Sequence, residues 1–278
     1  MGLLQSRGSR AGRYQRLSAG IHDRAVELVS REPPGRALDV GAGDGTLTRR
    51  LLAAGHDVCA LDRVIDEKLA ATGRARAADL NQPLPFPDES FDIAVCLEVI
   101  EHLENPWFLV RELHRVVRPG GVVVISTPNL DSVFVRGYFL MTGRLYNFLD
   151  AAYEDIGHIT PVYLWNLRRM IERLFALEAV TYNFDMLPKL GTTLPGRTRL
   201  LGQCVVVRLR RLPGDTPQLG RRWDDAHVVT SRARHVGHRL RAAQPRRRVH
   251  SSRSAMGTNA RSRTRYRRHS RLGSSRSR

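Results

Sequence analysis

The chain reads Leu38-Asp39-Val40-Gly41-Ala42-Gly43-Asp44-Gly45-Thr46 where a short apolar run meets three closely spaced glycines. Residues 37–40 predict a buried strand and residues 46–54 predict the helix that follows it. Glycines at such a junction permit positive φ angles and let a ligand approach the backbone. The helix behind them offers free N–H groups and a positive dipole end. The spacing Gly-x-Gly-x-Gly differs from the Gly-x-Gly-x-x-Gly of dinucleotide loops, which disfavours a nicotinamide oxidoreductase.

Strands and helices alternate along the chain on both sides of this loop. The strands are continuously apolar, which is typical of a parallel sheet covered by helices on both faces, so we predict an α/β, doubly wound fold. Residues 130–160 are aromatic and are expected to be irregular, either as a lid or acceptor pocket or as a plain packing layer. The further predicted strands are 58–62, 75–79, 91–97, 122–126, 177–182 and 204–209, and the further predicted helices are 21–30, 106–117 and 161–175.

The positive charge is concentrated towards the carboxyl end of the chain. The net charge of the sequence is +18, and residues 213–278 contain eighteen Arg, no Lys and three Asp. No apolar face persists in this segment, and such a composition does not bury enough surface to fold. We therefore predict a loose basic arm at 1–20, a folded domain at 21–212 and a disordered Arg-rich tail at 213–278. The tail either contacts polyanions nonspecifically or has no selected role, as an out-of-frame extension would.

The cysteines and the hydropathy of the sequence indicate in which cellular compartment the protein is expected. Three scattered cysteines, Cys59, Cys96 and Cys204, form neither a disulfide framework nor a paired zinc site, and we interpret them as small apolar fillers. Free thiols indicate a reducing compartment, so we expect a cytoplasmic protein. No stretch reaches the roughly 18 uncharged apolar residues that a membrane helix needs.

Acidic residues follow the second and third predicted strands. Asp62 ends the second strand, and a carboxylate there can accept hydrogen bonds from both hydroxyls of a ribose. Asp79-Leu80 ends the third strand, where a carboxylate can meet an adenine amino group. Carboxyl ends of parallel strands meet at one edge of the sheet, so these acids and the glycine loop predict a nucleoside site.

These motifs occur in a fixed order: residues 39–45, Asp62, Asp79-Leu80, residues 91–95, residues 98–102 and residues 118–121. In this order and spacing the chain resembles the class I S-adenosylmethionine-dependent methyltransferases over most of the predicted domain. Within them it is most similar to the O-methyltransferases that act on small molecules, glycans and quinones. The resemblance implies a Rossmann-like seven-stranded sheet whose last strand is antiparallel.

The resemblance also implies S-adenosyl-L-methionine as cofactor, lying across the carboxyl ends of the first, second and fourth strands. Asp62 would then hold the ribose. Asp39 can instead be a helix-capping or loop-bracing acid. The cofactor-binding residues implied are Asp39, Gly41, Ala42 and Gly43 at the carboxypropyl and ribose portion, Asp62 at the ribose, Asp79 and Leu80 at the adenine, and Leu97 and Glu98 at the methionine end.

The segment Glu98-Val99-Ile100-Glu101-His102 is the best candidate for the chemical step. Glu101 and His102 are predicted to be catalytic, because a general base is needed when the acceptor is a hydroxyl. Three interpretations stay open for the segment: a base, a structural brace, or a divalent-metal site completed by His158. Similar segments in quinone-pathway and small-RNA 2′-O-methyltransferases bind a divalent ion.

We therefore expect methyl transfer to a small-molecule, lipid or glycan acceptor, at a hydroxyl oxygen. The segments Gly157-His158-Ile159-Thr160-Pro161 and 164–168 resemble methyltransferases of sugars, glycans and lipids. One alternative is a metal-assisted RNA 2′-O-methyltransferase anchored by its basic tail. Another is a non-enzymatic polyanion-binding protein, although the tail has few aromatic residues for stacking on bases.

Overall fold

The computed structural model describes residues 20–183, 185–187, 192–194 and 198–214. The chain divides into two units, residues 1–221 and 222–278, and the described residues all belong to the first. The predicted arm at 1–20 and tail at 213–278 lie outside the described residues, apart from 20, 213 and 214. Among the described helices, none has the length and apolar character needed to cross a membrane.

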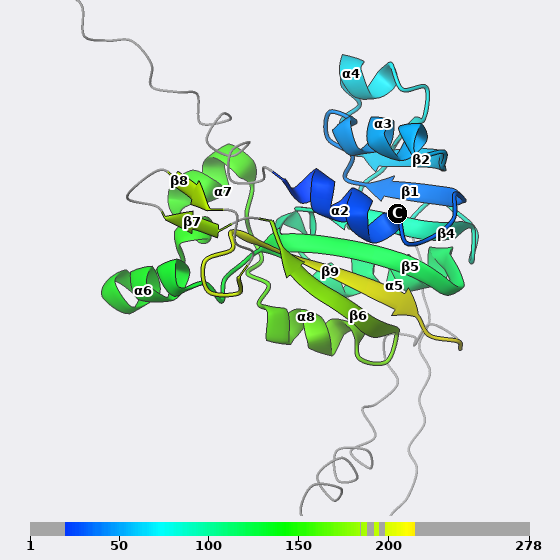
Figure 1. The fold of residues 1–278 in the computed structure, drawn as a ribbon. Helices are drawn as coiled ribbons and strands as arrows, with labels where there is room; N and C mark the ends of the chain where they lie inside the picture. The colour runs from blue at the N-terminus through cyan, green and yellow to red at the C-terminus, as the bar shows by residue number, and fades with distance from the viewer. Residues whose placement is uncertain (1–19, 184, 188–191, 195–197, 215–278) are drawn as a thin grey trace, which may run out of the picture. The chain divides into compact units, whose positions relative to one another are not determined.

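Seven strands form one sheet in the order β3-β2-β1-β4-β5-β9-β6 (Figure 1). Strand β9 runs antiparallel to both of its neighbours, while the strands from β3 to β5 are parallel to one another. The predicted seven-stranded sheet with an antiparallel last strand is therefore confirmed. The described elements are α2 (Ile21–Val29), β1 (Arg36–Val40), α3 (Thr46–Ala53), β2 (Asp57–Asp62), α4 (Glu67–Ala70), β3 (Ala75–Ala77), β4 (Phe91–Leu97), η1 (Ile100–His102), α5 (Pro106–Val116), β5 (Val117–Pro128), α6 (Val133–Thr142), η2 (Tyr146–Phe148), α7 (Asp150–Ile156), α8 (Leu164–Ile171), β6 (Phe175–Tyr182), β7 (Asp185–Leu187), β8 (Thr192–Leu194) and β9 (Cys204–Arg211).

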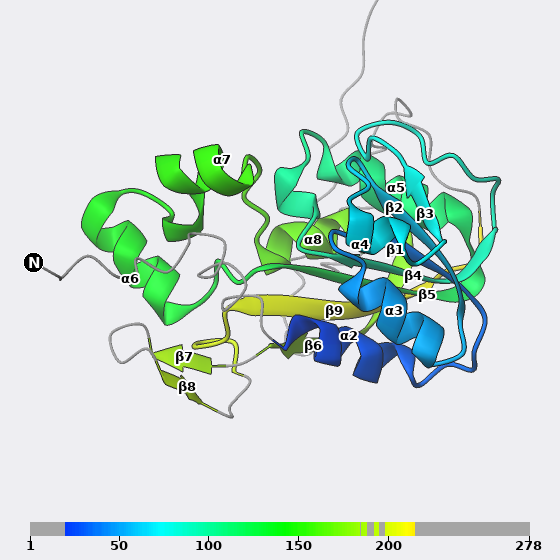
Figure 2. The ribbon, with the colours of Figure 1, turned by 90° about the horizontal axis from the view of Figure 1, so that it is seen from above.

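Both faces of the sheet are covered, as Figure 2 shows with α2 and α3 on one side and α5 and α8 on the other. Along β4, Ala94 and Cys96 belong to the apolar cluster under α5 and α8, and Ile93 and Val95 belong to the cluster under α2 and α3. Successive residues of a strand point to opposite faces, so a strand buried on both sides is apolar throughout. This explains the continuous apolar runs in the sequence.

The region expected to be irregular is largely helical. Residues 130–160 contain α6, η2 and α7, so that expectation is wrong. Ser132 caps α6 by accepting a hydrogen bond from the Val135 N–H at 3.2 Å, and Gly143 ends the helix in the left-handed conformation. The apolar pattern does not reveal α6, because Val135 is its one buried residue while Leu140 and Met141 are exposed.

Two predicted elements are shorter than expected. Strand β3 ends at Ala77 instead of reaching Asp79, whose carboxylate accepts hydrogen bonds from the backbone and side chain of Asn81 and so forms a turn. The helix expected at 161–175 is confined to α8, Leu164–Ile171. Strands β7 and β8 form a separate hairpin that the sequence pattern did not predict.

Candidate active site

The glycine loop joins β1 to α3 at the carboxyl edge of the sheet. Gly41, Gly43 and Gly45 all have positive φ. A side chain at Gly41 would lie 2.3 Å from a methyl group of Val99, so the loop packs against the segment after β4. At Gly43, by contrast, no atom of the described residues lies within 4 Å of the position of an added Cβ. The outer side of the loop is therefore open to a ligand.

Asp62 faces this open loop. Its carboxylate accepts hydrogen bonds from the Gly43 N–H at 2.9 Å and from the Val64 N–H at 3.1 Å. The two bonds hold the acid at the carboxyl end of β2, directly beside the glycine whose outer side is unfilled. The structure thus brings together Asp62 and Gly43, as the sequence predicts for a ribose-binding acid.

Asp39 lies beneath the loop instead of beside its opening. It is buried at 2% exposure, and its carboxylate accepts a hydrogen bond from the Thr48 hydroxyl at 2.6 Å. Burial raises the pKa of Asp39 to about 7, and the neighbouring charge of Asp62 adds to the increase. The observed interaction is the bracing of α3, one of the two roles considered for Asp39, while contact with a cofactor stays a prediction.

Asp79 and Leu80 begin the loop that leads to β4. Asp79 is exposed, and Leu80 contributes to the larger apolar cluster. The side chain of Asn81 donates to Asp79 at 3.2 Å and accepts from the Glu104 N–H at 3.1 Å. The predicted adenine-binding acid is therefore linked through one amide to the segment that follows Glu98, Glu101 and His102.

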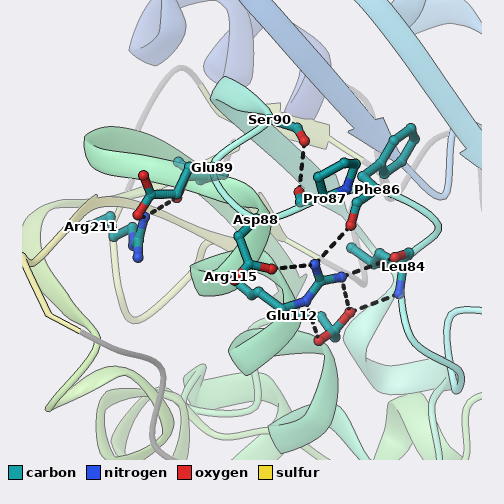
Figure 3. Close-up of polar contacts among 10 residues, drawn as sticks. Leu84, Phe86, Pro87, Asp88, Glu89, Ser90, Glu112, Arg115 and Arg211 are labelled. Atoms are coloured by element: carbon teal, nitrogen blue, oxygen red, sulfur yellow. Dashed lines mark hydrogen bonds and ion pairs between the residues drawn. The ribbon is translucent and has the colours of Figure 1, made fainter.

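The rest of this loop is fixed by Arg115 of α5 (Figure 3). Its guanidinium donates to the carbonyls of Leu84 and Phe86 at 3.0 and 2.8 Å. It also pairs with Asp88 at 2.8 Å and with Glu112 at 2.7 Å. Glu112 in turn accepts a hydrogen bond from the Leu84 N–H at 2.8 Å. The charged side chains of Arg115 and Glu112 thus hold the loop after Asp79 by hydrogen bonds to its backbone.

Glu98 adopts a backbone conformation that is rare for a residue with a side chain, with φ of 54°. The Ser126 hydroxyl accepts from the Glu98 N–H at 3.0 Å and donates to its carboxylate at 2.8 Å. The Cys204 thiol donates to the other carboxylate oxygen at 3.2 Å. Burial raises the pKa of Glu98 to about 7. Strained backbone conformations of this kind concentrate at functional sites.

Glu101 is fully buried on η1, directly behind Glu98. One carboxylate oxygen accepts a hydrogen bond from the Thr127 hydroxyl at 3.1 Å, and the other has no hydrogen-bond partner among the described residues. Burial, reinforced by the nearby Glu98 carboxylate, raises the pKa of Glu101 well above its ordinary value. Because the ionised forms of Glu98 and Glu101 are both disfavoured by burial, a proton or a cation near these carboxyl groups is stabilising.

His102 and the segment that contains His158 come together here, although Gly157 lies 55 residues after His102 in the sequence. The backbone carbonyl of Glu101 accepts from the N–H groups of Ile159 and Thr160, which brings His158 beside His102 at a ring separation of 4.8 Å. Nδ1 of His102 lies 3.1 Å from the Gly157 carbonyl, and a carbonyl can only accept, so Nδ1 carries the proton. Nε2 of His102 therefore keeps its lone pair, and burial lowers the pKa of the ring.

A divalent ion fits three of these residues. Donor atoms of Glu101, His102 and His158 lie within 4.8 Å of one another. One carboxylate and two imidazoles suit a transition metal better than magnesium, which prefers oxygen ligands. Glu98, which the sequence analysis considered as a ligand, is not in this group.

The remaining predicted residues line the same edge of the sheet. Ala42 is buried in the loop, and Leu97 is half-buried at the end of β4. Open space beside Gly43, the acid next to it and the buried acids after β4 fit the chemistry of an adenosyl cofactor. These are residues that would hold such a cofactor, and they occupy one continuous edge.

Two polar partners in the site are not apparent from the sequence. Thr127 is the residue before the last one of β5, and its position gives some signal, because Ser126-Thr127 follows a run of valine and isoleucine. The interpretation of Cys204 as an apolar filler is wrong, since its thiol donates to Glu98. Nothing in the sequence pattern of β9 indicates this contact.

Comparison with known proteins agrees with this geometry. Residues 38–125 match the family described as "Methyltransferase domain". The chain is 34% identical over 118 residues to 27-O-demethylrifamycin SV methyltransferase of Amycolatopsis mediterranei, covering 38% of this chain and 43% of that protein. It is 32% identical over 144 residues to the ubiquinone biosynthesis O-methyltransferase of Psychrobacter cryohalolentis, covering 46% and 55%. The chain thus spans about half the length of these curated relatives.

A solved structure shares the fold. It is an S-adenosylmethionine-dependent methyltransferase of Thermotoga maritima, described as a possible histamine N-methyltransferase, with a TM-score of 0.53 and 18% identity. The superposition covers 72% of this chain and 94% of that one. The family match at residues 38–125, the sheet order and the loop between β1 and α3 agree and support a class I S-adenosylmethionine-dependent methyltransferase.

Proposed function

We propose that the protein transfers a methyl group from S-adenosylmethionine to a hydroxyl oxygen of a small-molecule acceptor, lipids and glycans included. The observation that carries the proposal is the Asp62–Gly43 hydrogen bond of 2.9 Å, which places an acid at the glycine of this loop whose outer side is open among the described residues. The names of the relatives support oxygen as the methylated atom, since one is a ubiquinone biosynthesis O-methyltransferase and another methylates a 27-O-demethyl compound.

The bound cofactor would supply a methyl group already activated on a sulfonium. The protein then has to align the acceptor and exclude water, and orientation of this kind can contribute about 7–11 kcal/mol. In this proposal Asp62 holds the ribose, Asp79 and Leu80 border the adenine, and Glu98 faces the methionine end. The raised pKa of Glu98 results from burial, so a nearby positive charge would favour its ionised form.

His102 is the base in this proposal. Its Nδ1–H is directed at the Gly157 carbonyl, which leaves Nε2 as the acceptor of the hydroxyl proton. Burial lowers its pKa, so the ring is neutral at physiological pH and able to take a proton. Glu101 is fully buried and therefore acts as a positioning residue behind the loop.

Calorimetric titration with S-adenosylmethionine tests the proposal. We expect micromolar affinity in the wild-type protein and a loss of about 100-fold in Asp62→Ala, because a charged hydrogen-bond acceptor contributes about 1.5–3 kcal/mol. The matched control is Asp23→Ala, which removes an exposed acid paired with Arg50 on the surface. Absence of binding in the wild-type protein, or equal affinity in both variants, would reject the proposed cofactor site.

A second candidate is metal-assisted transfer, favoured by the approach of Glu101, His102 and His158 within 4.8 Å. Such an ion would lower the pKa of an acceptor hydroxyl bound to it. Titration with Mn²⁺ or Zn²⁺ tests this, with His158→Ala expected to abolish binding and His114→Ala, on α5 away from the loop, expected to retain it. Chelator-resistant methylation by a metal-free protein would exclude it.

The RNA version of this candidate rests on the Arg-rich residues 213–278 in addition to the possible ion. It predicts methylation of RNA that depends on both the ion and those residues. Mass spectrometry of small hydroxyl acceptors and of an RNA oligonucleotide, each incubated with labelled cofactor, separates the two. Activity on a small acceptor that survives removal of residues 215–278 would support the first proposal.

A further inference from the structure

A hollow of about 300 Å³ opens at the amino ends of β1, β2 and β3, away from the carboxyl edge that carries the predicted cofactor residues. Its floor is apolar and is formed by Cys59 and Phe91, which lie on one face of the sheet, while the Val58 side chain belongs to the apolar cluster on the other face. Its walls carry three arginines, Arg36, Arg74 and Arg76. The sheet separates the two sites, because four residues of β1 span roughly 13 Å.

The arginines are fixed in different ways and keep donors for a ligand. Arg36 lies over the ring of Phe91, 5.4 Å from its centre, and its guanidinium makes no hydrogen bond or ion pair with any described residue. Arg76 uses one nitrogen on the Pro85 carbonyl at 3.0 Å. Arg74 pairs with Asp57 at 2.9 Å. Each guanidinium has five N–H donors, so all three retain several.

The lining has a clear excess of positive charge. Asp57 is the acid among the lining residues, and it is already paired with Arg74. Nearby Asp92 accepts from the Arg36 backbone N–H and pairs with Arg118 outside the hollow. An anion entering between Arg36 and Arg76 would therefore meet two guanidinium groups without a carboxylate on either.

We propose that this hollow binds the phosphate group of a small phosphorylated molecule, at a site separate from that for methyl transfer. Planar guanidinium forks match phosphate oxygens in pairs, and phosphate offers oxygens in several directions to arginines from β1, from β3 and from the residue before β3. The volume is at the lower end of the range for small-ligand pockets, which suits a compact ligand. Cys59 and Phe91 provide an apolar floor for the part of the molecule next to the phosphate.

Cys59 gives a readout specific to this site. It is the half-buried cysteine of the three, and it lies in the lining, whereas Cys96 and Cys204 are buried elsewhere. Alkylation of the full-length protein by iodoacetamide at pH 8.5, followed by peptide mass spectrometry, measures Cys59 separately. A ligand over the floor slows its modification in proportion to occupancy, by about tenfold at ten times its Kd.

The probes are inorganic phosphate, pyrophosphate and phenyl phosphate, each compared with sodium chloride at equal ionic strength. We expect saturable protection of Cys59 by at least one phosphate probe and none by chloride. In Arg36→Ala the ratio of the alkylation rate with the probe to the rate without it should rise to about one, and Arg36→Lys should restore part of the protection. The matched control is Arg169→Ala, which removes another guanidinium over an aromatic ring, 5.1 Å from the centre of Trp165.

Because each variant is compared with itself, a change in intrinsic thiol reactivity does not affect the ratio, and Arg36→Lys carries the test if Arg36→Ala does not fold. Equal effects of phosphate and chloride would overturn the proposal, as would full protection in Arg36→Ala or protection by an RNA oligonucleotide alone. Binding of S-adenosylmethionine is measured separately, so failure here is distinguishable from failure of the proposed methyl transfer.

Discussion

Folding buries the carboxyl group of Asp39. Its hydrogen-bond donor in the folded protein is the Thr48 hydroxyl and not a cation. Its pKa rises from 3.8 to about 7, so between these values the folded state binds more protons than the unfolded state. Stability contributed by this group is therefore lost as pH rises through that interval.

Asp39→Asn should for this reason stabilise the protein in a pH-dependent manner. An asparagine oxygen can still accept the Thr48 hydrogen bond without the cost of a buried charge. We expect a gain in unfolding free energy on the order of 2 kcal/mol at pH 8 and little change at pH 4. Urea denaturation of both proteins at the two pH values measures it, and a gain independent of pH would contradict the cause given.

The Ser126 hydroxyl is hydrogen-bonded to both the backbone N–H and the carboxylate of Glu98. Ser126→Ala removes the two hydrogen bonds that stabilise a φ of 54°, so Glu98 should relax from the left-handed conformation. We expect cofactor affinity to fall by about tenfold, the equivalent of one hydrogen bond. Calorimetry measures this, with Ser90→Ala as control because its hydroxyl donates to Pro87 on the loop surface. Unchanged affinity would show that Ser126 does not position Glu98.

At the level of elements, α5 fixes the loop after β3 through Arg115 and Glu112 (Figure 3). Arg115→Met leaves the largely buried Glu112 carboxylate without its cation, so we expect unfolding free energy to fall by about 3 kcal/mol. Arg118→Met is the control, because its pair with Asp92 is exposed and should contribute less than about 1 kcal/mol. Chemical denaturation measures both, and equal losses would contradict a special role of this loop anchor.

The elements that the sequence predicts correctly are those whose burial is complete. Strand β4 was expected at 91–97 and is found at Phe91–Leu97, since both of its faces contact apolar clusters. Helix α6 was missed, because its apolar residues are mostly exposed and follow no buried stripe. Its signals are instead local ones, the Ser132 cap and Gly143 at its end.

The residues of the site likewise divide into those that the sequence predicts and those that it does not. Asp62 and the glycine loop were predictable, because strand ends in a parallel sheet converge at one edge. The approach of His158 to His102 depends on backbone hydrogen bonds from Ile159 and Thr160 to Glu101, and sequence spacing does not encode such contacts. The partners of Glu98 come from β5 and β9, whose adjacency is a property of the folded sheet.

At the scale of the whole domain, carboxyl groups gather at one edge of the parallel sheet and guanidinium groups at the other. Asp39, Asp62 and Glu98 lie at or near the carboxyl ends of strands, where a sulfonium would be stabilised. Arg36 and Arg76 lie near the amino ends, around the hollow proposed for phosphate. A cationic and an anionic ligand would thus be attracted to opposite edges, and none of the side chains assigned to either site lies beyond residue 214.

Removal of residues 215–278 should accordingly lower the positive charge of the protein without changing its affinity for the cofactor. Arg211 closes the described fold by donating to the Val117 carbonyl at 2.7 Å and pairing with Glu89, and these residues are retained. We expect the affinity for S-adenosylmethionine to stay within about twofold, since no side chain assigned to its site is lost. Retention on an RNA column should fall and lose its salt dependence, because eighteen arginines are removed with three aspartates. A large loss of cofactor affinity would show instead that these residues contribute to the site.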